Sequence, residues 1–200
     1  MDLVYLLSLT YCLIQVLRTG TWRRFPLFAV STAAAAVFEI AYQPYSAAWL
    51  KSCYASMVMP LLVLRSLAVA EAFVRSSAGF RQRKLIAAAA LCFALLFAVI
   101  VAWRFNALDV LHSAIQARRV VVVALSAFLG TYMLLMWSVG YRRSGLAGLH
   151  VLLMFLACSV MAASVLLRMA YPVGIWEALA ASSYAAASLV YITWGILISA

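Results

Sequence analysis

The chain has 200 residues, of which 68% are apolar and 10% are charged, with a formal net charge of +10 and a mean hydropathy of +1.08. A soluble domain is about half apolar and a quarter charged, so this composition excludes one and predicts an integral membrane protein. The basic residues separate apolar runs instead of forming a basic domain, which argues against nucleic-acid binding.

Seven apolar runs follow one another along the chain, each of a length that suits a helix across about 30 Å of hydrocarbon. They are residues 2–17, 25–41, 47–73, 84–103, 117–139, 147–169 and 175–198. The runs are continuous and rich in Ala and Leu, which favours helices over strands. The sequence therefore predicts an all-α polytopic membrane protein, a single domain of residues 1–200 built as a bundle of seven transmembrane helices. The first run has no basic segment before it and no small-residue cleavage site, so we expect it to be a retained span.

Short junctions separate most of these runs. The first, "RTGTWRRFP", places Pro26 where a helix starts, and short connections make consecutive helices antiparallel neighbours. The exception is residues 103–119, in which Asn106 and Asp109 resemble a helix cap and an acidic first turn. We expect residues 106–117 to form an amphipathic helix at the outer interface, or an extension of the fifth helix.

The basic residues also predict an orientation. Junctions after the first, third and fifth runs contain Arg18, Arg23, Arg24, Arg75, Arg81, Arg83, Lys84, Arg142 and Arg143. The opposite side has Lys51, Arg104, Arg118, Arg119 and Arg168. Basic residues favour the cytoplasmic side, so the N-terminus is predicted outside and the C-terminus in the cytoplasm, with the bacterial inner membrane as the expected location.

Several runs carry dense clusters of small residues, such as "STAAAA", "AAAA", "ACSVMAAS" and "ALAASSYAAAS". In lipid, small residues let helix backbones approach closely. The clusters fit either a tightly packed monomer or contacts with other membrane subunits. We therefore expect the bilayer and other membrane subunits, in a homo- or hetero-oligomer, as partners.

Arg65 lies inside the third apolar run, 14 residues after Lys51. At 1.5 Å per residue this is about 21 Å from the outer interface. Side chains on a helix lean toward its N-terminus, so Arg65 points away from the nearer, cytoplasmic interface. A lipid-facing arginine at this depth costs at least about 2.5–3.5 kcal/mol, so we expect Arg65 to face the bundle interior. Glu71 precedes Arg75 by one turn, and we expect these two to pair.

Two groups of polar residues are candidate sites. Counting from the predicted helix ends gives the residues that share the depth of Arg65: Gln15, Ser31, Thr32, Thr131, Tyr132, Tyr191 and Thr193. This internal polar layer is either a hydrogen-bond network between helices, which we favour, or a site for an anionic or carbonyl group. Glu39, Arg168 and Glu177 form a second, outer charge cluster, which is either a salt-bridge tie or the lining of a vestibule.

Recognisable catalytic motifs are absent. Lys51 and Lys84 are the only lysines, so the last span has none to hold retinal, and His112 and His150 are predicted on opposite sides, so they cannot pair on a haem. No HExxH or GxSxG motif is present, and the four cysteines have no metal-binding spacing. We expect no enzyme activity, metal or cofactor, and we expect structural lipids.

These observations favour a protein that works through helix contacts, as a subunit of a larger membrane assembly or as a membrane-embedded sensor. The alternative is a small-solute transporter or channel that uses the polar layer around Arg65, with Pro60 as a break in the third span.

Overall fold

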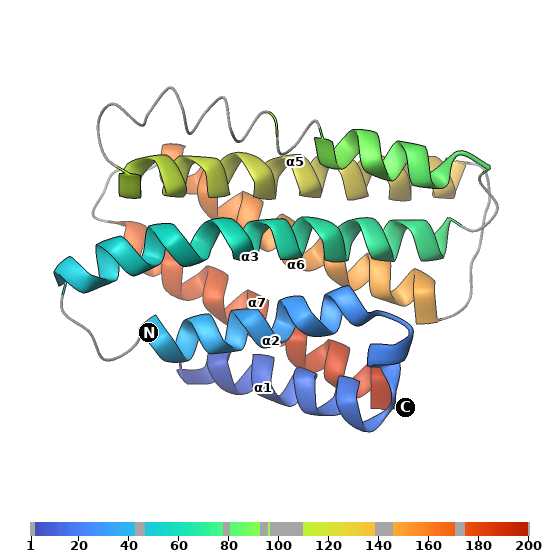
Figure 1. The fold of residues 1–200 in the computed structure, drawn as a ribbon, viewed down its shortest axis with the longest axis horizontal. Helices are drawn as coiled ribbons and strands as arrows, with labels where there is room; N and C mark the ends of the chain where they lie inside the picture. The colour runs from blue at the N-terminus through green and yellow to red at the C-terminus, as the bar shows by residue number, and fades with distance from the viewer. Residues whose placement is uncertain are drawn as a thin grey trace.

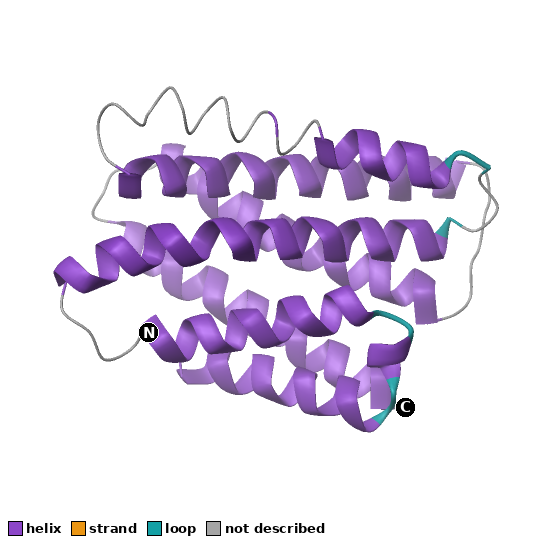
Figure 2. Cartoon of the chain, in the orientation of Figure 1, coloured by secondary structure: helices purple, strands orange, loops and turns teal. Residues whose placement is uncertain are grey.

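The computed structural model describes residues 3–42, 47–77, 81–92, 96, 110–138, 146–170 and 175–199. Regular structure within these ranges is entirely helical (Figure 2). In chain order the elements are α1 (Leu3–Arg18), the 3-10 helix η1 (Thr21–Arg23), α2 (Pro26–Tyr42), α3 (Ala47–Ser76), α5 (Val110–Ser138), α6 (Leu146–Ala170) and α7 (Trp176–Ser199). Residues 83–92 form a further helical stretch. The all-helical prediction is confirmed for this part of the chain.

Four helices contain segments long and apolar enough to cross a membrane: Met57–Ser76, Ala117–Met136, Ala147–Leu167 and Ala181–Ser199. The apolar helices Leu3–Arg18 and Pro26–Ile40 are shorter. The chain thus has the helices of an integral membrane protein, while seven spans and their orientation stay predictions. α5 begins at Val110, so residues 110–117 form its first turns, and residues 106–109 lie outside the described ranges.

The labelled helices form a closed ring. α1 packs against α2, α2 against α3, α3 against α5, α5 against α6, α6 against α7, and α7 returns to α1. α3 also contacts α6 across the ring, and the helices run side by side along one axis (Figure 1). Because large apolar side chains such as Leu7, Val37 and Leu134 are exposed on the outside, the apolar surface faces both inward and outward, as in a bundle in lipid.

The connection from α1 to α2 is a compact turn. Gly20 has φ of 70°, a left-handed conformation that glycine adopts without steric cost, and it leads into η1. Pro26 then opens α2, where its missing N–H costs nothing because the first helical N–H groups have no partner within the helix.

Glu71 of α3 supplies the hydrogen-bond acceptor that the backbone N–H groups at the start of α2 lack within their own helix. Its Oε2 accepts the backbone N–H of Leu27 at 3.0 Å and that of Phe28 at 3.1 Å. Its Oε1 lies 3.5 Å from Arg75 Nη2, so the expected pair is present as well. A carboxylate at this place also meets the positive end of the helix dipole of α2. The side chain of Glu71 is therefore a cap that joins two helices, which local sequence spacing does not indicate.

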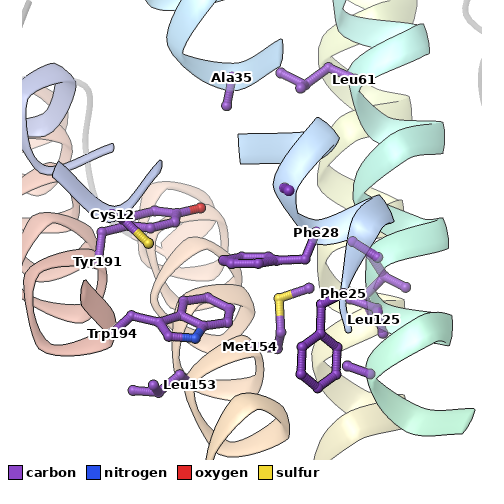
Figure 3. Close-up of a cluster of buried hydrophobic side chains, with 14 of the residues drawn as sticks. Cys12, Phe25, Phe28, Ala35, Leu61, Leu125, Leu153, Met154, Tyr191 and Trp194 are labelled. Carbon is purple, nitrogen blue, oxygen red and sulfur yellow. The ribbon is translucent and has the colours of Figure 1, made fainter. Parts of the chain in front are cut away.

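Aromatic side chains fill the ring toward the end where α2 begins. The rings of Phe28 and Trp194 are stacked with centroids 4.1 Å apart, and His150 lies 4.0 Å from Phe25 and 4.8 Å from Trp194. Figure 3 shows Phe28 between Trp194 and Phe25, with Tyr191 beside Trp194. This cluster joins α2, α6 and α7 at one level.

Hydrogen bonds between side chains link neighbouring helices at several points in the described part of the chain. Ser76 Oγ donates to Tyr132 Oη at 3.0 Å, which ties the end of α3 to α5. Ser126 Oγ and Ser159 Oγ are 3.0 Å apart and tie α5 to α6. Such bonds contribute about 0.6 kcal/mol each within membranes, so packing holds the ring and these bonds fix its register.

Gly195 allows α7 to lie close to α1. A Cβ at this position would stand 2.5 Å from Cε1 of Tyr11, too close for any carbon contact. We expect Gly195→Ala to destabilise the protein by about 1–3 kcal/mol through overpacking, reduced by the better helix propensity of Ala. Thermal unfolding in detergent measures the loss. At Gly130 the added Cβ would be 3.1 Å from a Phe155 ring carbon, so Gly130→Ala is the milder control. Equal stability of the two variants would contradict the prediction.

Candidate functional site

A polar pocket of about 350 Å³ opens inside the ring, toward the end where α1 begins and α2 ends. All six labelled α-helices contribute to it. The lining residues are Tyr5, Phe38, Glu39, Val58, Leu61, Leu62, Arg65, Arg118, Arg119, Val122, Met161, Ser164, Val165, Ser183, Tyr184 and Ala187. The volume is within the usual range of about 300–1,000 Å³ for small-molecule sites.

Arg65 projects into this pocket from α3, as its side-chain lean predicts. Its Nη1 contacts Sδ of Met161 on α6 at 3.5 Å. Thioether sulfur is a weak acceptor, and a guanidinium carries five N–H donors. Among the residues that the structure describes, Arg65 has no other hydrogen bond, so most of its donor capacity faces the pocket.

Tyr5 of α1 presents a second donor without a partner. The residue is only 2% exposed, and its Oη has no hydrogen-bond partner within the described part of the chain. Its ring is held by edge contacts with Tyr184 at 5.3 Å and Tyr191 at 6.0 Å, which fix the direction of the hydroxyl. Tyr5 lies within electrostatic range of Arg65, so both donors address one region. A buried hydroxyl left unpaired costs about 1–3 kcal/mol, which is unusual in a purely structural role.

Charged side chains line the pocket. Its described lining contains three arginines, Arg65, Arg118 and Arg119, and one carboxylate, Glu39. Among these arginines, Glu39 interacts electrostatically with Arg118 first and Arg65 second.

The structure separates most members of the proposed internal polar layer from Arg65. Tyr191 alone lies within its electrostatic range. Thr131 and Thr193 are exposed on the outside of the ring. Tyr132 is bound to Ser76, at the far end of α3 from the pocket.

The remaining members of that layer are also elsewhere. Ser31 and Thr32 are buried, and Thr32 Oγ1 donates to the carbonyl of Phe28 in its own helix. Gln15 does not line the pocket, and its Oε1 is buried without a described partner. Counting residues from helix ends does not give the side of the helix on which a residue lies. It also gave the wrong depth for Tyr132, which contacts Ser76 at the end of α3.

Of the outer charge cluster, Glu39 lines the pocket together with Arg65. The side chains of Arg168 and Glu177 lie outside the described part of the structure. The sequence predicts Glu39 in the outer cluster and Arg65 in the inner layer, but the two share one pocket because the arginine side chain extends toward the start of α3.

Sequence reasoning did not assign six polar lining residues to a site: Tyr5, Arg118, Arg119, Ser164, Ser183 and Tyr184. The two arginines served only to predict the orientation. The other four lie in apolar or small-residue runs, where their signal is weak. No group of three His, Cys, Asp or Glu residues that could hold a metal occurs among the residues described.

No protein-family model, curated protein or solved structure matches the chain.

Proposed function

We propose that this chain is a seven-helix, non-enzymatic membrane protein that acts as a sensor: a small ligand binds in the pocket around Arg65, and the helix ring passes the event to partner subunits. The observation that carries the proposal is a pair of hydrogen-bond donors in one pocket, the Arg65 guanidinium and the buried Tyr5 hydroxyl. Within the described part of the chain the first has one weak bond and the second has none. A ligand that accepts hydrogen bonds would satisfy both.

The ring offers a route for the signal. The pocket is lined from α1, α2, α3, α5, α6 and α7, so one ligand would contact six helices at once. α3 contains Pro60, which removes a backbone hydrogen bond within the helix and favours bending there. Val58 and Leu61, on either side of Pro60, both line the pocket. Binding would therefore act on α3 where the helix bends most easily.

A small-solute transporter or channel is the second candidate. It is favoured by the position of a charged pocket inside a ring of helices, next to a proline-interrupted helix, which is the arrangement of many transport sites. In that case the ligand would cross the membrane instead of staying bound.

The test uses the protein in lipid nanodiscs and a panel of small charged and neutral solutes. We expect at least one solute to raise the unfolding temperature of the wild type and not that of Arg65→Leu. The control is Arg18→Leu, because Arg18 is exposed at the end of α1 and outside the pocket. If the protein also carries the same solute across the membrane of proteoliposomes, it is a transporter and not a sensor. Stabilisation that survives Arg65→Leu would refute both.

For orientation, we propose that the N-terminus is outside and the C-terminus cytoplasmic, in the bacterial inner membrane. The pocket then opens toward the outer face. Two reporters are fused after Ala200, one active only in the cytoplasm and one active only in the periplasm. We expect activity from the cytoplasmic reporter alone, because the basic junctions favour that side. Activity of the periplasmic reporter would contradict this orientation and place the pocket on the inner side.

A further inference from the structure

We infer that the ligand of the Arg65 pocket is a small organic monoanion, a carboxylate attached to an apolar body. This inference rests on the proposed ligand binding and names its chemical class. The juxtaposition behind it is a guanidinium and a phenol hydroxyl that face a pocket together with a group of apolar side chains from four helices.

The charge of Arg65 selects the sign of the ligand. Glu39 is the one carboxylate among the described lining residues, and its first electrostatic partner is Arg118. The single hydrogen bond that Arg65 makes within the described part of the chain goes to the neutral Sδ of Met161. A cationic ligand would be repelled by the guanidinium, and a neutral one would offer it no opposite charge in a low-dielectric site.

The donors of the pocket suit a carboxylate. A guanidinium presents two parallel N–H groups that match the two oxygens of a carboxylate. The Tyr5 hydroxyl supplies a further donor within electrostatic range of Arg65. The present contact of Arg65 with Met161 Sδ is weak, so a carboxylate would replace it at small cost. The ligand thus supplies acceptors to the two groups that lack them among the described residues.

The rest of the pocket favours a single charge and an apolar body. Phe38, Val58, Leu61, Leu62, Val122 and Val165 contribute apolar surface from four helices. A dianion such as a phosphate monoester would bring a second charge against this surface, and removing that charge from water is costly.

Four water-soluble probes of similar size separate the possibilities: benzoate, phenyl phosphate, benzyl alcohol and benzylamine. Each is titrated into the protein in nanodiscs, and binding is measured by calorimetry and by the rise in unfolding temperature. We expect benzoate to bind at least about tenfold more tightly than each of the other three, because only benzoate matches both the charge and the apolar wall.

Variants of the pocket test the assigned contacts. Arg65→Leu is expected to weaken benzoate binding by about 100-fold or more, and Arg65→Lys by about tenfold, since lysine keeps the charge without the planar fork. Tyr5→Phe removes one hydrogen bond and should weaken binding by about 2- to 12-fold without loss of packing. Glu39→Gln removes the competing negative charge and should tighten binding several-fold. Thr193→Ala, at an exposed position of α7, is the control and should change nothing.

The outcomes separate this inference from the function on which it rests. If benzylamine, benzyl alcohol or phenyl phosphate binds best and depends on Arg65, the carboxylate class is wrong and ligand binding stands. If benzoate binds equally well to Arg65→Leu and to Tyr5→Phe, the assigned site is wrong. If none of the four probes and no solute of the panel binds, both the class and the proposed function fall.

Discussion

Replacing Trp194 by Ala should lower the free energy of unfolding by about 3–5 kcal/mol, the usual cost of removing a large aromatic side chain from a packed interior. Trp194 is 1% exposed and is stacked on Phe28 at 4.1 Å, with His150 at 4.8 Å and Tyr191 at 6.1 Å. Its loss would leave a void where α2, α6 and α7 meet, and the opposing rings would lose their contacts.

The measurement is thermal unfolding in detergent, followed with a thiol-reactive fluorophore. Cys12 is fully buried and becomes reactive only when the ring opens, so the other three cysteines, Cys53, Cys92 and Cys158, are changed to Ser in every variant to remove background. The unfolding temperature is expected to fall by about 10 °C or more in Trp194→Ala. The matched control is Trp22→Ala, because Trp22 is 42% exposed. Equal losses for the two tryptophans would show that the aromatic cluster contributes little to stability.

Glu71→Ala is expected to cost about 3 kcal/mol, because hydrogen bonds to a charged group contribute about 1.5–3 kcal/mol each and two backbone N–H groups of α2 would lose their acceptor. The loss also removes a negative charge from the N-terminal end of α2 and the partner 3.5 Å from Arg75. The damage should be local to the joint between α2 and α3.

Glu71→Gln is the graded control. The amide keeps one acceptor oxygen but no charge, so we expect a cost of about half that of the Ala variant. Hydrogen exchange at the amides of Leu27 and Phe28 reports the cap directly and should accelerate in both variants. Unchanged exchange at these two amides in Glu71→Ala would contradict the assigned role, whatever the change in unfolding temperature.

Helix positions were predictable from the sequence because apolar runs and their interruptions set them. The third predicted run ends at residue 73 and α3 at Ser76, and the seventh predicted run begins at residue 175 and α7 at Trp176. The fifth helix starts at Val110, earlier than the apolar run, because polar residues that leave the hydrocarbon can continue a helix. Length and hydropathy identify helices, whereas the number that crosses the bilayer also depends on α1 and α2, which are short.

The candidate site was predictable only in part. Arg65 was identified because a charge inside an apolar run is costly, and its direction followed from helix geometry. Its neighbours were not identified, because they depend on how six helices are rotated about their axes. Tyr5 illustrates this limit: it begins an apolar helix, and only the ring contacts with Tyr184 and Tyr191 show that its hydroxyl is buried and directed by packing.

The contact of α1 with α7 has a consequence for biogenesis. Leu9, Cys12 and Val16 of α1 are fully buried, and Tyr11 lies against Gly195 in a helix that is synthesised about 180 residues later. During translation, that face of α1 has no final partner until α7 has entered the membrane. A nascent chain stalled before α7 would therefore expose this face of α1 to lipid and to membrane chaperones or proteases, so completion of the ring is a natural checkpoint for quality control.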